Sequence, residues 1–400
     1  MTPMRRVGDI AEQIRGVTYA KSDASSTPRE GYAPVLRAGN IGDGELIFDD
    51  LVYVPVARIS GRQMVRRGDV LIAASSGSIA VVGKAAQARQ ALGGGFGAFC
   101  KVLRPGNDVD PGYFAHYFRT SDYRRRVSAL AQGANINNLR SEHLDGLEIP
   151  LPPLVEQRRI AGILDAADGL RVKRRESITL LDTLTQSIFL DMFGDADPGW
   201  VRCVVLDAAA DDKGSIRTGP FGSQLLHSEF VDAGVAVLGI DNAVNNEFRW
   251  GERRFITDGK YQELSRYRVF PGDVLITIMG TTGRCAVVPD DIPVAINTKH
   301  LCCISLNRQK CLPEYLHAYF LHHPDARDYL GRQGKGAIMV GLNMGLIKAM
   351  PLLMPPISLQ AQFVARLNAV GQAIDAAIRA SAEGDSLFAT LQVRAFRGEL

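Results

Sequence analysis

The stretch Pro150-Leu151-Pro152-Pro153-Leu154-Val155-Glu156-Gln157 decides the fold, because a related stretch follows it 203 residues later. There the sequence reads Leu353-Met354-Pro355-Pro356-Ile357-Ser358-Leu359-Gln360. Proline lacks a backbone N–H and clashes with the preceding helical turn, so a proline pair does not lie inside a helix. A helix can begin directly after each pair. We therefore expect two equivalent helices, one central and one at the C-terminal end of the chain.

Other segments repeat in the same order at offsets of 202 to 204 residues. Gly68-Asp69-Val70-Leu71-Ile72 returns as Gly272-Asp273-Val274-Leu275-Ile276, Val35-Leu36-Arg37-Ala38-Gly39-Asn40 resembles Val237-Leu238-Gly239-Ile240-Asp241-Asn242, and His116-Tyr117-Phe118 resembles Ala318-Tyr319-Phe320. Such a period is too long for a solenoid repeat. It indicates a duplicated half-molecule, which implies a pseudo-twofold relation between the halves.

Composition limits the class of protein. The 400 residues, 46% apolar and 22% charged, are ordinary for a globular chain of two or three domains. The net charge of +3 means that any nucleic-acid contact must come from local patches. The sequence has no run of 18 apolar residues and no secretory h-region, so we expect no membrane association and a cytoplasmic location, with the six cysteines reduced.

Each half is expected to have a mixed part and a helical part. Short apolar runs at 69–74 and 273–278 predict buried strands, and helices are expected at about 111–131 and 313–331. After each proline pair an apolar stripe continues for roughly 40 residues, or about 60 Å of helix. Arg171, Arg174, Ser381 and Gly384 interrupt the stripes. Two such helices in one chain predict an antiparallel coiled coil, the alternative being that each packs only on its own globular part.

The expected fold is therefore α+β, with two similar mixed α/β domains separated by two long helices. The predicted division is 1–150 for the first domain, 151–196 for the central helix, 197–353 for the second domain and 354–400 for the C-terminal helix.

Motifs for catalysis, cofactors and metals are missing. The sequence contains no G-x-x-x-x-G-K-[ST], H-E-x-x-H or G-x-S-x-G motif, so we expect no catalytic residues and no cofactor. Cys302, Cys303 and Cys311, with His317 and His322, have a loose metal-ligand spacing, but no C-x-x-C pair accompanies them. We interpret them as buried strand cysteines followed by a helix, and predict no metal site.

Polar loops at matching points of the two halves indicate DNA contact. Asparagine and arginine side chains can bind base edges, while serine, threonine and backbone amides hold phosphates. The predicted DNA-binding residues are Arg37, Asn40, Ser75, Ser76, Ser78, Asn135, Asn137 and Asn138 in the first half, and Arg217, Ser223, Asn242, Thr281, Thr282, Arg284 and Lys335 in the second.

With these features the chain resembles the DNA-specificity (S) subunit of type I restriction-modification systems over nearly its whole length. Four segments carry the resemblance: residues 149–160 and 181–195 at the two ends of the central region, Gly214-Ser215-Ile216-Arg217-Thr218-Gly219-Pro220-Phe221-Gly222-Ser223-Gln224, and Ala395-Phe396-Arg397-Gly398-Glu399-Leu400. The second proline pair lacks the Glu-Gln-Arg run of the first, and the first domain lacks a clear Gly-Pro-Phe-Gly opening.

The resemblance implies a non-catalytic reader of double-stranded DNA. Two target-recognition domains would each read half of a bipartite site, and the paired helices would set the spacer. Modification (methyltransferase) and restriction (motor-nuclease) subunits would be its partners, with Gln157, Arg158 and Gln360 as subunit contacts. The alternatives are a stand-alone DNA-binding or scaffold protein outside restriction and, with less support, a DNA methyltransferase.

Overall fold

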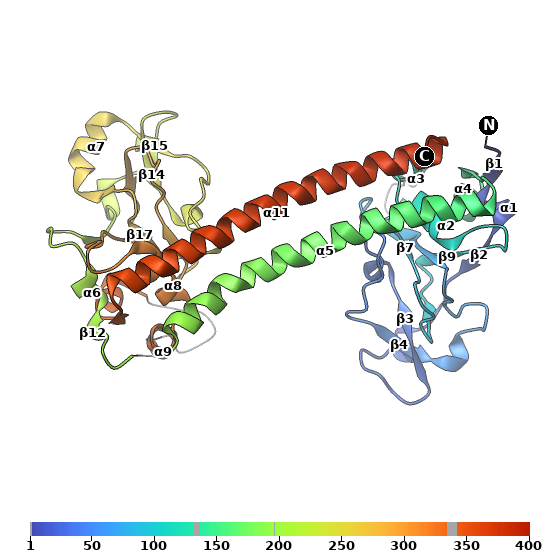
Figure 1. Ribbon diagram of the computed structural model, residues 1–400, viewed down its shortest axis with the longest axis horizontal. Helices are drawn as coiled ribbons and strands as arrows, with labels where there is room; N and C mark the ends of the chain where they lie inside the picture. The colour runs from blue at the N-terminus through green and yellow to red at the C-terminus, as the bar shows by residue number, and fades with distance from the viewer. Residues whose placement is uncertain (1, 131–136, 196, 334–341) are drawn as a thin grey trace. The chain divides into compact units, whose positions relative to one another are not determined.

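The computed structural model describes residues 2–130, 137–195, 197–333 and 342–400. The chain forms two compact units: unit 1 comprises Met1–Ser177 and Ala377–Leu400, and unit 2 comprises Ile178–Ala376. Each unit contains a mixed globular part together with portions of both long helices, α5 (Leu154–Phe193) and α11 (Ile357–Arg397) (Figure 1). The expected α+β class is confirmed, while the predicted four-segment division stays a prediction.

Unit 1 is built on a four-stranded antiparallel sheet in the order β2-β9-β5-β7. A second sheet has the order β4-β3-β8, in which β3 and β8 are parallel, and β1 pairs with β11 just before α5. The strands are β1 (Met4–Arg6), β2 (Ala11–Arg15), β3 (Tyr32–Leu36), β4 (Val52–Pro55), β5 (Val70–Ala73), β6 (Ser75–Ser76), β7 (Ala85–Gln87), β8 (Gly95–Phe96), β9 (Cys100–Pro105), β10 (Asn137–Asn138) and β11 (Glu148–Pro150). The α-helices are α1 (Val7–Ile10), α2 (Pro111–Tyr117), α3 (Ser121–Leu130) and α4 (Ser141–Asp145).

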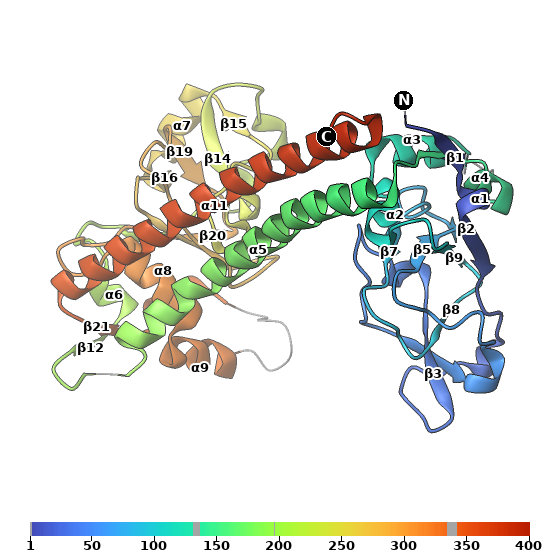
Figure 2. The ribbon, with the colours of Figure 1, turned by 45° about the vertical axis from the view of Figure 1, so that its right-hand side comes forward.

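Unit 2 repeats this topology with one additional strand, β16, in its second sheet, which confirms the duplication. Its four-stranded sheet has the order β13-β20-β17-β18, its second sheet the order β15-β14-β19-β16, and β12 pairs with β21 just before α11. The strands are β12 (Val201–Val204), β13 (Ile216–Thr218), β14 (Val235–Leu238), β15 (Phe255–Ile256), β16 (Arg268–Val269), β17 (Val274–Thr277), β18 (Cys285–Val287), β19 (Ala295–Asn297), β20 (Leu301–Ile304) and β21 (Pro351–Met354). The α-helices are α6 (Val205–Ala208), α7 (Asp258–Leu264), α8 (Pro313–His322), α9 (Pro324–Gln333) and α10 (Met344–Lys348). Figure 2 shows β12 and β21 together at the start of α11.

The apolar runs form the central strands as predicted: every residue of β5 and of β17 is buried. We expected a single helix at about 111–131 and another at about 313–331. Both predictions are wrong, because each range contains two shorter helices. The first ends at Tyr117, because the Thr120 hydroxyl bonds the Tyr117 carbonyl and accepts from the Tyr123 amide, which starts a new helix. The second is divided at His323, directly before Pro324.

The long helices pack against each other within each unit. In unit 1, Arg171 binds Asp385 at 2.6 Å, Arg174 donates to the Ala380 carbonyl at 2.7 Å, and Arg159 reaches the Leu400 carbonyl. Residue numbers rise along α5 as they fall along α11, so the pair is antiparallel, and both ribbon views show it (Figures 1 and 2).

In unit 2 the Phe363 ring of α11 lies 5.6 and 5.5 Å from those of Phe189 and Phe193 of α5. The alternative of unpaired helices is therefore wrong. The residues that interrupt the stripes are part of the contact in unit 1: a Cβ at Gly384 would lie 2.6 Å from the Arg174 guanidinium.

Candidate nucleic-acid interface

Two of the predicted polar loops of unit 1 meet at the end of β5. Ser75 and Ser76 form β6, which pairs antiparallel with β10 in the register Asn138 to Ser75 and Asn137 to Ser76. The two serines are half-buried, and Ser78 and Asn138 are exposed. The structure therefore joins polar residues that are about 60 positions apart in the sequence, whereas Asn135 lies outside the described residues.

Backbone hydrogen bonds fix this loop. The Phe99 carbonyl accepts from the amides of Ala74 and Ser75, and the Leu139 amide donates to the Ala74 carbonyl at 2.8 Å. From α3, the Arg124 guanidinium donates to the carbonyls of Val82 at 2.8 Å and Ala80 at 3.1 Å. Polar side chains are thus presented on a preformed backbone, which lowers the entropy cost of binding a rigid partner.

Sequence reasoning missed Phe99, which borders the same loop. Its residue surface is 66% exposed, although large aromatic residues are usually buried. The motif Gly97-Ala98-Phe99-Cys100 gives no signal of this, because an aromatic residue before a strand is typical of a core. An exposed ring beside serine and asparagine side chains suits apolar contact with a thymine methyl group.

His300 occupies the matching position in unit 2, because its carbonyl accepts from the Ile278 amide as that of Phe99 accepts from Ala74. Partial burial, with the charges of Lys299 and Arg254, lowers the pKa of His300 below its ordinary value. The imidazole is therefore mainly neutral at pH 7 and can both donate and accept a hydrogen bond. The two units thus present different chemistry at one shared position.

The predicted loop of unit 2 is a tight turn between β17 and β18. The buried Thr277 hydroxyl accepts from the Arg284 amide at 2.8 Å, and the Gly283 amide donates to the Thr277 carbonyl at 2.9 Å. Gly280 and Gly283 have φ of 75° and 82°, values that favour glycine. The turn exposes Thr281 and Arg284 and half-buries Thr282. Ser223 is exposed in a separate turn, and Lys335 lies outside the described residues.

Two predicted DNA contacts are structural instead. Asn40 and Asn242 are each 3% exposed. The Asn40 amide accepts from the Arg37 backbone at 2.9 Å and donates to the carbonyls of Ile47 and Asp49, and Asn242 accepts from Gly239 and donates to Arg249. These asparagines close matching turns after β3 and β14, so their assignment to DNA is wrong.

Two of the three predicted arginines are also engaged within the protein. Arg217 binds Asp273 at 2.7 Å, with side-chain exposures of 10% and 3%, and its assignment to DNA is wrong for that reason. In unit 1 the matching aspartate, Asp69, also forms a buried ion pair, but its partner Arg104 comes from β9, which is not the counterpart of β13. Arg37 is more accessible, although its guanidinium donates to the carboxylate of Asp50 at 2.8 Å.

Of the three predicted subunit contacts, two are buried glutamines and one is an exposed arginine. Gln157 is 1% exposed: its oxygen accepts from the Asp110 amide, and its nitrogen donates to the carbonyls of Asp108 and Pro152. Gln360 makes the matching three bonds to Leu312, Lys310 and Pro355. Each glutamine anchors a long helix to its own unit, so neither side chain is available to a partner. Arg158 is exposed.

The cysteines of unit 2 are buried thiols. Burial raises the pKa of Cys302 and of Cys311 to about 12, and it also raises the pKa of Cys303. All three thiols are therefore protonated at neutral pH. Among the described residues, histidine, cysteine and acidic side chains do not gather in threes as a metal site requires. None of the helices in the described part of the chain has the length and apolar character needed to cross a membrane.

Comparisons with known proteins agree on one family. Residues 3–180 match the model of the type I restriction modification DNA specificity domain. The chain is 30% identical to the specificity subunit of the type I restriction enzyme StySPI of Salmonella potsdam and to that of EcoKI of Escherichia coli K12. Each alignment covers 98% of this chain and 88% of the relative.

Solved structures share the fold. A chain from a study of complex assembly and conformational transition of the type I R-M system matches with a TM-score of 0.65, 17% identity and complete coverage of both chains. The S subunit of a type I restriction-modification system from M. genitalium matches with a TM-score of 0.52 and 14% identity over 98% of this chain and 96% of its own.

Proposed function

Because this chain belongs to the family of type I restriction enzyme specificity subunits, we propose that it is the sequence-specific DNA-recognition subunit of a type I restriction-modification complex. It binds double-stranded DNA and assembles with modification and restriction subunits, which carry out methylation and cleavage. The chain itself is not catalytic. We place the complex in the cytoplasm, where its DNA substrate is present.

In this proposal each unit reads one half of a bipartite target. The observation that carries it is the pairing of β6 with β10, which presents Ser78, Asn138 and Phe99 together on a fixed backbone. The matching turn of unit 2 presents Thr281 and Arg284, with His300 in place of Phe99. Because these side chains differ, the two units would read different half-sites.

The test is to sequence methylated DNA from cells that express this chain with its modification subunits. We expect one motif with two defined halves and an undefined spacer. Asn138→Ala or Phe99→Ala should relax the half read by unit 1, and Thr281→Ala or Arg284→Ala the half read by unit 2. Losing one good base contact costs about 1–3 kcal/mol, or roughly ten- to a hundredfold in discrimination.

The exposed Arg379 of α11 supplies the control, and Arg379→Ala should leave both halves unchanged. A contiguous motif, or one half-site relaxed by substitutions in both units, would contradict the proposal.

A further inference from the structure

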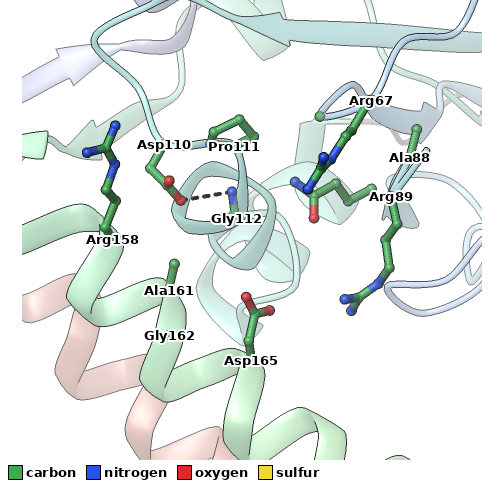
Figure 3. A pocket seen from close by; sticks show the side chains of 12 residues that line it. Arg67, Ala88, Arg89, Asp110, Pro111, Gly112, Arg158, Ala161, Gly162 and Asp165 are labelled. Carbon is green, nitrogen blue, oxygen red and sulfur yellow. Dashed lines mark hydrogen bonds between the residues drawn. The ribbon is translucent and has the colours of Figure 1, made fainter. Parts of the chain in front are cut away.

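A cavity of about 620 Å³ lies in unit 1 between the start of α5 and the body of the domain. Three arginines line it from three separate segments: Arg67 from the turn before β5, Arg89 after β7, and Arg158 from the first turns of α5 (Figure 3). All three are exposed. Among the described residues, none has a carboxylate within the 4.0 Å of an ion pair. Guanidinium groups that line one cavity without an ion-pair partner can bind carboxylates or phosphates.

The two acidic residues of the cavity already have structural tasks. Asp110 accepts from the amides of Gly112 and Tyr113 and caps α2, the bond to Gly112 being the one drawn in Figure 3. Asp165 lies 3.0 Å from His116, and the hydrogen bond from that imidazole holds the pKa of Asp165 below its usual range. The charge of Arg89 also favours the ionised form of Asp165, although the two side chains do not form an ion pair. The carboxylates therefore stabilise the domain, and all three guanidinium groups can still bind a ligand.

The duplication supplies an internal control for the role of these arginines. Unit 2 has the same fold, yet Arg67, Arg89 and Arg158 correspond there to Pro271, Pro289 and Ala361. The correspondence follows from Gly68 and Gly272, whose amides bind the carbonyls of Ala88 and Val288, and from the matching glutamines before Arg158 and Ala361. Unit 2 therefore forms the same fold without these three charges, so the fold itself does not require them.

Apolar surface adjoins the charges. Val155, one helical turn before Arg158, is 79% exposed and corresponds to Ser358 in unit 2. A smaller cavity of about 250 Å³ shares Gln87, Ala88 and Arg89 with the first, and Phe48, 48% exposed, lines it. Apolar anchors beside cationic groups are typical of protein interfaces.

The position of the cavity favours a protein over DNA. Gly68 lies at the start of β5, and the predicted base-reading loop begins at Ser75, after its end. Four strand residues, about 13 Å, separate the two ends of this strand. A methylating partner must be held beside the unit that reads its half-site, and this end of the sheet is away from the reading loop.

We propose that the cavity formed by Arg67, Arg89 and Arg158 binds an acidic segment of a modification subunit, at a contact that unit 2 does not provide. This inference rests on the proposed function, since it takes the modification subunit as the partner. Carboxylates of the segment would pair with the three guanidinium groups, and an apolar side chain would pack on Val155 or Phe48. The two modification subunits of a complex would then bind with unequal affinity.

The test compares Arg158→Glu and Arg67→Glu with the matched control Ala361→Glu, which places a carboxylate at the corresponding exposed position of α11. The full chain is titrated with its modification subunit, and native mass spectrometry counts the subunits bound. We expect each arginine substitution to raise the Kd of one modification subunit about tenfold or more, so that a complex with a single such subunit accumulates. The control should change Kd by less than about twofold.

Three outcomes would overturn the inference. An unchanged Kd means that the cavity does not bind this subunit, and an equal effect of Ala361→Glu means that added negative charge acts anywhere on the chain. If the arginine variants instead weaken binding to all DNA sequences and lower the salt dependence by about one counterion, the cavity holds a phosphate. DNA titrations of the wild-type chain test half-site recognition separately, so a failure of the proposed function is distinguishable.

Discussion

Asp168 joins a charged network on the face of α5 that is turned toward α11. Its carboxylate accepts from Arg119 at 2.7 and 2.9 Å and from Arg171 at 2.9 Å, and Arg171 continues to Asp385. Burial opposes ionisation of Asp168, but the hydrogen bonds and charges of Arg119 and Arg171 outweigh it and lower its pKa. The carboxylates of Asp168 and Asp385 thus pair with the guanidinium groups of Arg119, Arg171 and Arg175 in unit 1.

We predict that Asp168→Asn destabilises unit 1 at pH 7 by about 3–5 kcal/mol, because Arg119 and Arg171 lose their shared buried carboxylate. The folded-state pKa lies below the unfolded value of about 3.9, so the contribution of the carboxylate is complete above that pH and declines as the pH falls through the folded pKa. The difference between wild type and variant should therefore shrink below about pH 4. Hydrogen exchange of unit 1 amides in urea, at neutral and acidic pH, measures this difference in unfolding free energy between wild type and variant. A difference independent of pH would contradict this account.

At the scale of residues, the sequence predicted which residue types lie in the loops better than it predicted which of their side chains face solvent. Ser78, Thr281 and Arg284 are exposed as a DNA contact requires, because they follow strands in turns, and Asn138 is exposed at the end of the short strand β10. Asn40, Asn242 and Arg217 belong to the same residue types, but the tertiary structure places backbone groups or a carboxylate against them. No local pattern distinguishes a polar side chain that caps a turn from one that faces solvent.

At the scale of elements, one aromatic ring of α11 packs against an arginine of α5 in unit 1. Phe388 of α11 is 4% exposed, and the guanidinium groups of Arg171 and Arg119 lie 4.4 and 5.2 Å from its centroid. Cations above an aromatic face attract its quadrupole. The ring thereby packs against two guanidinium groups of the charged network.

We predict that Phe388→Ala destabilises unit 1 by about 3–5 kcal/mol, through lost burial and the cavity left behind. Leu387→Ala is the matched control. Leu387 precedes Phe388 in the sequence but is 58% exposed, so its truncation should cost less than about 0.5 kcal/mol. Urea unfolding of both variants, followed by hydrogen exchange in α5 and α11, compares them. Similar losses for the two variants would show that the ring does not hold the pair together.

The long helices were predictable because strong local signals start them. Proline pairs precede both, and an apolar stripe continues for about eleven turns. The β6–β10 pair was not predictable as a pair, because each strand has two residues and its partner lies about 60 positions away. Short strands are specified by their surroundings rather than by their own sequence.

At the scale of the whole molecule, the duplication separates structural from functional residues. The glutamine anchor recurs in both units as Gln157 and Gln360. A buried aspartate recurs as Asp69 and Asp273, although its arginine partner comes from a different strand in each unit. Phe99 and Arg158 are replaced by His300 and Ala361. What both copies keep stabilises the fold, and our proposals assign DNA and partner binding to exposed positions at which the copies differ.

The paired helices connect the two units, and in the proposed function their length sets the spacer between half-sites. Seven residues lengthen a helix by about 10 Å, and DNA rises about 3.4 Å per base pair, so one heptad corresponds to about three base pairs. We predict that heptads inserted after Glu176 in α5 and before Ala377 in α11 lengthen the spacer by about this amount and leave both half-sites unchanged. Because both helices grow equally, their pairing is kept within each unit.

A heptad in α5 alone should abolish methylation of the bipartite site, since the two helices then differ in length. Sequencing of methylated DNA reads both results directly, and altered half-sites with an unchanged spacer would show that the helices do not measure the distance.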